Sequence, residues 1–550
     1  MISLLTLLAC NPTVRQNTTD TSSETEEITD TETEMLVECP EGLTLSAQTN
    51  NGCLTGTELV NSEAFLGIPY AQSPTGERRW QRPQPAGLWP DIFPAEQYME
   101  MCLQPNLEPM GSPFLGSEDC LGLNVFRPKG TQAEAGLPIL FYIHGGSYEY
   151  GSGEQNEDMT LAENTIVVTH NYRLGNLGFL AHPSLTQEDA TLSQTSGTSG
   201  NQGIYDTLLA LQWTVDNASA FGGDPEQLLI VGESAGGISV CALLASPLAE
   251  GLFSAAGIMS AGCLWVNQHL NEDDGFVETA ESQGQRFSDT LGCTGDEVEL
   301  LECMRNADAE VVLSTIPDEM SNFPVIDGLL MEEAPSSAFY FGRFPEVPIF
   351  AGVTADEGTL FTHDYGIETR EELEQYLETW AQSMNISDTD TLKALYSTEV
   401  YSDPQNAFDQ FYGDLIFVCP TQFFLDSTSY HTNTHAYYHT HIPSWNDDYP
   451  QLNGYGAYHS SELVFLFGSG LEYLTPSERT LSEQIRGTWQ NFANGTAEIP
   501  GFGEWPVYGA NASSLQDGGK WVEWDSTSTQ LATGIRQERC DFIRQQWWGQ

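Results

Sequence analysis

The stretch Gly232-Glu233-Ser234-Ala235-Gly236 has the pattern Gly-x-Ser-x-Gly and stands between a strand-like and a helix-like segment. The apolar run Gln227–Val231 precedes it, and the small and aliphatic residues Gly237–Leu244 follow it. In a sharp turn from strand to helix, the serine is raised above the edge of the sheet, and glycines flank it because side chains there would collide with neighbouring backbone. The positive end of the helix dipole also lies near the serine. The stretch therefore predicts Ser234 as a nucleophile.

Short apolar runs elsewhere alternate with helix-like segments, which is typical of a mostly parallel sheet flanked by helices. Besides 227–231, we expect buried strands at 137–143, 166–169, 348–353 and 436–439. One helix is indicated by apolar residues at helical spacing, which are Ile204, Leu208, Leu211 and Val215. The segments 268–345 and 366–415 are mostly helical in pattern and are interpreted as insertions over the sheet. The sequence thus predicts an α/β fold with helical insertions.

A glycine-containing loop follows the predicted strand 137–143, with the sequence His144-Gly145-Gly146-Ser147. Acyl transfer to a serine needs hydrogen-bond donors for the oxyanion that develops on the substrate. Small residues after this strand would let backbone N–H groups face the substrate carbonyl. An ordinary glycine turn is the alternative, and the serine motif downstream favours the oxyanion interpretation.

The acid and the base should follow the serine in the chain, acid first. Asp356-Glu357-Gly358 comes directly after the predicted strand 348–353, where a carboxylate can point toward the active-site edge. His459 follows the strand 436–439 and a glycine-containing loop, but the chain has ten histidines and several others cluster nearby, at positions His431, His435, His439 and His441. The spacing of that cluster suits a strand rather than a metal site. On these grounds alone the choice among the histidines stays open.

The composition limits the kinds of partner. The formal net charge is −60, so the surface repels nucleic acid and anionic lipid. Such acidity suggests a marine or salt-loving source, and a soluble extracellular surface is the alternative. The 11 cysteines are irregularly spaced without a CxxC pair, which argues against zinc and for an oxidising compartment.

The N-terminus resembles that of a bacterial lipoprotein. Residues 1–10 (MISLLTLLAC) end in small residues before Cys10, which would be lipidated after cleavage, although a basic n-region is lacking. Residues 11–36 are rich in Thr, Ser and Glu, as expected of a disordered tether. A single domain over 37–550 would follow. The sequence therefore predicts an exported protein (periplasmic, outer-membrane-anchored or at the cell surface) that contacts membrane only through this lipid, and an arbitrary apolar start is the alternative.

Several further motifs occur in order along the chain. They are Phe65–Ala71 (FLGIPYA), Ser117–Asn124 (SEDCLGLN), Asn171–Gly175 (NYRLG), Gly200–Gly203 (GNQG), Phe221–Pro225 (FGGDP), Trp489, Phe492-Ala493 and Trp505-Pro506. With Gly232–Gly237 they resemble the type-B carboxylesterase family, which includes cholinesterases, animal carboxylesterases and bacterial para-nitrobenzyl-type esterases. The likeness covers about residues 52–545 and implies an α/β-hydrolase fold and a serine carboxylesterase.

The resemblance also implies residue roles. Ser234 would be the nucleophile, Glu357 the acid and His459 the base, with Gly146, Ser147 and Ala235 donating N–H groups to the oxyanion. Three disulfides would pair Cys102 with Cys120, Cys293 with Cys303, and Cys419 with Cys540; Cys39–Cys53 is a further expected pair, and Cys241 and Cys263 are expected to be buried thiols. No metal or organic cofactor is expected, and the partner would be a small-molecule ester.

Two features of the chain depart from the family pattern. Many members have a third glycine where this chain has Ser147, and residues 103–119 lack the tryptophan with which cholinesterases hold a quaternary amine, so no cation–π site is expected there. A catalytically idle cell-surface binding protein and an amidase or peptidase are the alternative functions. The acyl preference and the oligomeric state stay open.

Overall fold

The main sheet is built around strands whose side chains are apolar on both faces, as parallel strands covered by helices require. A computed structural model describes residues 35–548 except 108–111, 156–158, 274–276, 317–321, 402, 448–451, 453, 469 and 510–517. The chain from Leu36 to Gln550 groups into one compact unit. The predicted signal and Cys10, and nearly all of the predicted tether, lie outside the described residues.

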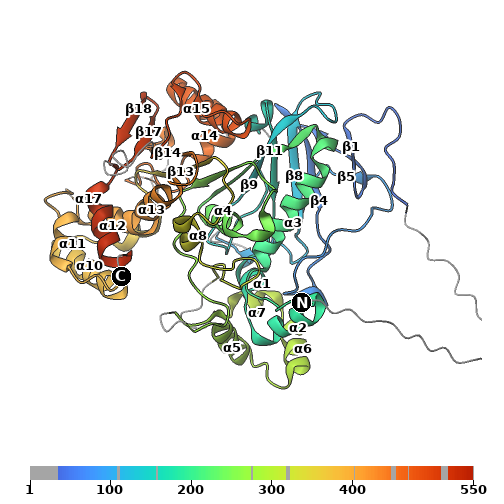
Figure 1. Cartoon of the computed structure of the whole chain (residues 1–550), viewed down its shortest axis with the longest axis horizontal. Helices are drawn as coiled ribbons and strands as arrows, with labels where there is room; N and C mark the ends of the chain where they lie inside the picture. The colour runs from blue at the N-terminus through green and yellow to red at the C-terminus, as the bar shows by residue number, and fades with distance from the viewer. Residues whose placement is uncertain are drawn as a thin grey trace, which may run out of the picture. The chain divides into compact units, whose positions relative to one another are not determined.

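Within the described chain, the main sheet has eleven strands in the order β18-β17-β14-β13-β12-β11-β9-β10-β8-β4-β3 (Figure 1). Their bounds are β3 Thr57–Glu58, β4 Ser62–Pro69, β8 Gly122–Pro128, β9 Leu137–Ile143, β10 Ile166–His170, β11 Gly223–Glu233, β12 Ala255–Met259, β13 Ile349–Thr354, β14 Thr434–His439, β17 Lys520–Asp525 and β18 Ser528–Thr533. Strands β17 to β10 in this order pair in parallel, and both margins of the sheet are antiparallel. The active-site face predicted for a parallel sheet is therefore the edge at the carboxyl ends of these strands.

Smaller pairings surround the main sheet. The order β1-β2-β5 and the hairpins β6-β7 and β15-β16 are formed by β1 Ser46–Thr49, β2 Gly52–Thr55, β5 Phe93–Pro94, β6 Gln104–Pro105, β7 Phe114–Leu115, β15 Glu498–Ile499 and β16 Gly503–Glu504.

Helices cover both faces of the sheet. The α-helices are α1 Gly175–Phe179, α2 Pro183–Ser193, α3 Gln202–Asn217, α4 Ala235–Ala245, α5 Ala280–Leu291, α6 Glu297–Asn306, α7 Ala309–Ser314, α8 Pro335–Phe341, α9 Thr359–Thr362, α10 Arg370–Ser383, α11 Thr389–Leu395, α12 Pro404–Gly413, α13 Cys419–Thr428, α14 Leu463–Phe467, α15 Pro476–Ala493 and α17 Gln537–Ile543. A π-helix, η6 (Asp414–Val418), joins α12 to α13. Figure 1 shows α4 and α15 on opposite sides of the sheet, and both contact its central strands.

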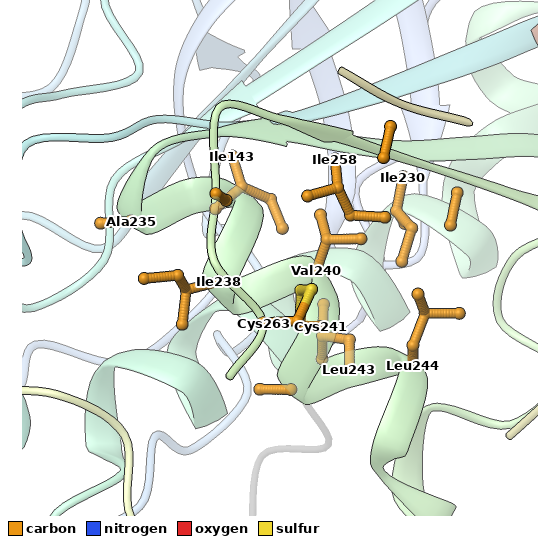
Figure 2. Close-up of a cluster of buried hydrophobic side chains, with 14 of the residues drawn as sticks. Ile143, Ile230, Ala235, Ile238, Val240, Cys241, Leu243, Leu244, Ile258 and Cys263 are labelled. Atoms are coloured by element: carbon orange, nitrogen blue, oxygen red, sulfur yellow. A yellow bond between two sulfur atoms is a disulfide. The ribbon is translucent and has the colours of Figure 1, made fainter. Parts of the chain in front are cut away.

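The two cores follow from the alternation of side chains along each strand. In β9, Ile139, Phe141 and Ile143 join the core beneath α4, whereas Leu140 and Tyr142 join the core beneath α15. Both sets are buried. Figure 2 shows the α4 side, where helix residues such as Val240 and Leu244 lie against the sheet residues Ile230 and Ile258. The position of α4, and hence of the serine ahead of it, is fixed by this packing.

The predicted elements occur, with shifted ends. Strand β11 begins at Gly223, whereas the sequence predicted a strand from Gln227. The fold class is the predicted α/β-hydrolase. No helix among the described residues combines the length and the apolar character needed to cross a bilayer.

Candidate active site

Ser234 occupies a sharp turn between β11, which ends at Glu233, and α4, which begins at Ala235. Its backbone has φ 57° and ψ −124°, a region that L residues rarely adopt and that costs of order 1–3 kcal/mol. The backbone N–H of Ser234 donates to the carbonyl of Met259 at 2.9 Å, which ties the turn to β12. The side chain is thereby presented at the carboxyl edge of the sheet.

The two flanking glycines are explained by backbone contacts. A Cβ on Gly232 would lie 2.3 Å from the carbonyl group of Gly236, and a Cβ on Gly236 would lie 2.0 Å from the carbonyl oxygen of Ile143. The first neighbour belongs to α4 and the second ends β9, so neither can move without moving a helix or a strand. The Gly-x-Ser-x-Gly pattern is therefore a steric requirement of the turn in this chain.

His459 and Glu357 form a buried pair. The Nδ1 atom of His459 lies 2.6 Å from Oε2 of Glu357, and the two residues are 4% and 1% exposed. The other oxygen, Oε1, accepts the hydroxyl of Ser260 at 2.6 Å and the N–H of Thr354 at 2.7 Å. The carboxylate is thus held by three groups from three segments of the chain.

The loops that carry this pair are joined to each other. Asp356 donates its N–H to the carbonyl of Ala457 at 3.0 Å, and its Oδ2 accepts the N–H of Ala457 at 2.9 Å. The Oδ1 atom of Asp356 accepts from Gln410 at 2.7 Å. Asp356 therefore fixes the loop ahead of His459 next to the loop of Glu357.

Two phenylalanine rings cover His459. The ring of Phe417 in η6 lies 4.5 Å from the imidazole, and the ring of Phe361 in α9 lies 5.1 Å from it. They limit the access of water to the imidazole, so its charge depends on the balance between this burial and the neighbouring carboxylates.

Glu233 is the residue that sequence reasoning missed. Its Oε1 lies 3.1 Å from Nε2 of His459, but this oxygen has no hydrogen-bond partner in the described structure, so the contact is electrostatic. The available signal was its place in the motif, directly before the serine. The hydroxyl of Ser234 has no hydrogen bond to His459 among the described residues, and such bonds are often loose without substrate.

Burial and charge act in opposite directions in this cluster. Burial alone would lower the pKa of His459, but the carboxylates of Glu233 and Glu357 raise it to about 9. Burial raises the pKa of Glu233 to about 7 and that of Glu462 to about 8. The cluster thus favours a protonated imidazole, which is the state that a general base reaches in the transition state.

The loop after β9 lies against the serine turn. A Cβ on Gly145 would be 3.0 Å from Cβ of Ser234. Gly146 has φ 103° and Ser147 has φ 56°, so this loop turns back on itself. Among the described residues, the N–H groups of Gly146, Ser147 and Ala235 have no hydrogen-bond acceptor. Gly145 therefore contacts the serine turn, and the three N–H groups expected as oxyanion donors have no other acceptor among the described residues.

The cysteines of the described chain form five disulfides. The pairs Cys102–Cys120, Cys293–Cys303, Cys419–Cys540 and Cys39–Cys53 are as expected. The expectation of buried thiols at Cys241 and Cys263 is wrong, because the two are joined by a disulfide with a Cα–Cα distance of 5.6 Å. Burial alone could not reveal that α4 brings Cys241 within bonding range of the loop after β12.

No metal group is found at the clustered histidines. Among the described residues, no three His, Cys, Asp or Glu side chains converge as ligands for an ion. His435 and His439 lie in β14, as the strand interpretation of their spacing expected.

A serine at a glycine-flanked strand-to-helix turn, on a mostly parallel sheet covered by helices, defines an α/β-hydrolase. The model of the carboxylesterase family matches residues 44–543. The chain belongs to the carboxylesterase family, and it is a carboxylesterase.

The relatives are esterases of several kinds. The chain is 32% identical to the para-nitrobenzyl esterase of Bacillus subtilis over 84% of this chain and 92% of the relative. It is 31% identical to the cholinesterase of Mus musculus (88% and 82%) and 30% identical to the fumonisin B1 esterase of Sphingopyxis macrogoltabida (84% and 84%). The solved structure of a PNB esterase aligns with a TM-score of 0.73 at 30% identity, over 91% of this chain and 100% of that one.

Proposed function

We propose that the protein hydrolyses small to medium carboxylic esters through an acyl-enzyme on Ser234, with His459 as general base and Glu357 as the acid that orients it. The observation that carries the proposal is the 2.6 Å contact between Nδ1 of His459 and Oε2 of Glu357. A carboxylate at Nδ1 favours the tautomer in which Nδ1 carries the ring proton and Nε2 can accept one. It also stabilises the imidazolium that forms when the serine attacks.

The reaction would proceed in two acyl-transfer steps. Ser234 loses its proton to Nε2 of His459 as its oxygen attacks the ester carbonyl. The tetrahedral oxyanion accepts hydrogen bonds from the N–H groups of Gly146, Ser147 and Ala235, and loss of one such donor costs about 3–4 kcal/mol. His459 returns the proton to the leaving alcohol, and a water molecule then repeats the cycle on the acyl-enzyme.

The composition of the loop closed by the Cys102–Cys120 disulfide supports a neutral ester rather than a cationic choline ester. The described part of 103–119 contains no tryptophan, so no cation–π contact with that ring is available there. The proposed substrates are therefore neutral esters, whose carbonyl oxygen is held by the oxyanion donors.

The test is hydrolysis of p-nitrophenyl esters from acetate to palmitate by the parent protein and by S234A, in dilute buffer and in molar NaCl. We expect activity that peaks at short chains, and a loss of about 10⁶-fold in kcat for S234A. Activity on anilides but not on esters would favour the amidase or peptidase alternative. No activity of the parent in either salt would favour the binding protein.

The proposal includes export to an oxidising compartment, with anchoring through a lipid on Cys10. Five disulfides in the described chain support the compartment. The lipid anchor is tested by partition of the full chain between a detergent phase and an aqueous phase. The parent and its C10A variant are both expressed in a bacterium and compared. The parent should enter the detergent phase and C10A the aqueous phase, and equal partition would contradict it.

A further inference from the structure

One loop after β12, residues 260–266, contacts the helix that begins after Ser234, the carboxylate of Glu357, and η6, which covers His459. Its covalent contact is the disulfide between Cys263 and Cys241, which lies in α4, the helix that begins directly after Ser234 (Figure 2). Both cysteines are fully buried. The loop is thereby bonded to the helix that presents the nucleophile.

The first residue of the loop holds the acid. Ser260 has φ 47° and donates its N–H to the carbonyl of Gly352 at 2.8 Å. Its hydroxyl donates to Oε1 of Glu357 at 2.6 Å. A displacement of the loop would therefore displace one of the hydrogen bonds that orient this carboxylate.

The end of the loop contacts the cover of the base. Trp265 donates its indole N–H to the carbonyl of Ile416 in η6 at 3.0 Å. The next residue of η6, Phe417, has its ring 4.5 Å from the imidazole of His459. The packing is close, since a Cβ on Gly262 would lie 2.8 Å from the same carbonyl oxygen.

We propose that the Cys241–Cys263 disulfide is a positioning element of the active site, which holds the acid and the base at fixed places relative to Ser234. This inference rests on the proposed function of the triad. Without the cross-link, the loop is held against α4 by packing alone, such as that of Ala261 against Gly237. Small displacements of catalytic groups cost far more in rate than in binding, since a shift of about 1 Å can cost about 10²-fold.

The experiment compares C241A/C263A with C39A/C53A as a matched control. The two disulfides span 22 and 14 residues, so both deletions release loops of similar length, but Cys39–Cys53 joins β2 to the segment before β1. The measurements are kcat, KM and the pH profile of kcat/KM for p-nitrophenyl butyrate, together with Tm. We expect kcat of C241A/C263A to fall about 10-fold or more with KM within about twofold, and its acidic limb to shift. The control C39A/C53A should have a lower Tm, whereas its kcat and its pH profile of kcat/KM should stay as in the parent.

The outcomes separate this inference from the proposed function. An inactive parent would overturn both, whereas an active parent with C241A/C263A behaving as C39A/C53A would overturn only the positioning role. Where the alanine pair does not fold, C241S/C263S, which is close in size to the two thiols, is measured instead. If neither C241A/C263A nor C241S/C263S folds while C39A/C53A does, the disulfide is required for folding and the inference is overturned.

Discussion

Replacing Glu357 with glutamine should abolish most of the activity because the structure dictates which way the amide must face. The Oε1 position accepts the backbone N–H of Thr354 at 2.7 Å and the hydroxyl of Ser260 at 2.6 Å. An amide nitrogen cannot occupy that position, since it would meet a fixed N–H donor. The NH₂ group of the new glutamine must therefore face Nδ1 of His459.

This orientation forces the wrong tautomer of His459. With a donor opposite Nδ1, the ring proton moves to Nε2, which can then no longer accept the proton of Ser234. The same change of tautomer in a serine-protease triad lowers kcat by about 10⁴. At about 1.36 kcal/mol for each factor of ten, E357Q should lose about 5 kcal/mol of transition-state stabilisation.

The assay is kcat and KM for p-nitrophenyl butyrate, with S234A as the baseline and E478Q as the matched control. Glu478 is equally buried but caps α15, where it accepts the N–H groups of Thr475 and Ser444 at 2.8 Å. E478Q should lower Tm and leave kcat unchanged. A value of kcat for E357Q within tenfold of the parent would refute the orientation argument.

Three further predictions follow from the charges and the backbone of the site. E233Q removes one of the three carboxylates that raise the pKa of His459, so the acidic limb of kcat/KM against pH should move to lower pH; an unmoved limb would contradict the electrostatic contact. S147G keeps the backbone donor and removes a side chain held at φ 56°, so kcat should stay within about threefold and Tm should rise slightly, whereas a loss of about 10²-fold would show that the side chain itself contacts the substrate. Since the net charge of −60 opposes compaction at low ionic strength, Tm should rise in molar NaCl; equal values of Tm in dilute buffer and in salt would contradict adaptation to salt.

The serine turn could be predicted because the residues that satisfy its steric constraints lie together in one short motif. A Cβ added to Gly232 or Gly236 would lie only 2.3 Å or 2.0 Å from backbone atoms, and these belong to the turn itself and to the end of the neighbouring strand. A five-residue pattern therefore carries the whole geometry. The strands beside it were also predictable, because β9 and β11 contain continuous apolar runs.

The acid and the base could not be chosen from local pattern alone. Glu357 and His459 are 102 residues apart in the chain, and their contact depends on the pairing of β13 with β14 and on the bond between Asp356 and Ala457. The order of acid and base along the chain narrowed the choice, and the family resemblance selected the residues.

Two features were missed for physical reasons. Strand β12 has the sequence AAGIM, which is poor in the β-branched residues that mark strands. A glycine is needed at position 257 because the ring of Phe350 occupies the place of a side chain there. Cys241 and Cys263 were expected to be thiols, since burial is as typical of thiols as of disulfides. Only the packing of α4 against the loop after β12 distinguishes the two states.

The charges around His459 create a conflict between its resting state and its catalytic state. Glu233 and Glu357 raise the pKa of the imidazole to about 9, which stabilises the imidazolium in the transition state and also in the free enzyme. At pH 7 the base would have to lose that proton first, at a cost of about 3 kcal/mol for a difference of about two pH units. A raised pKa also adds folding stability that is complete below about 6.5 and is lost as the pH rises through about 9. Activity should therefore increase toward alkaline pH while stability decreases over the same range, because the same carboxylates govern both.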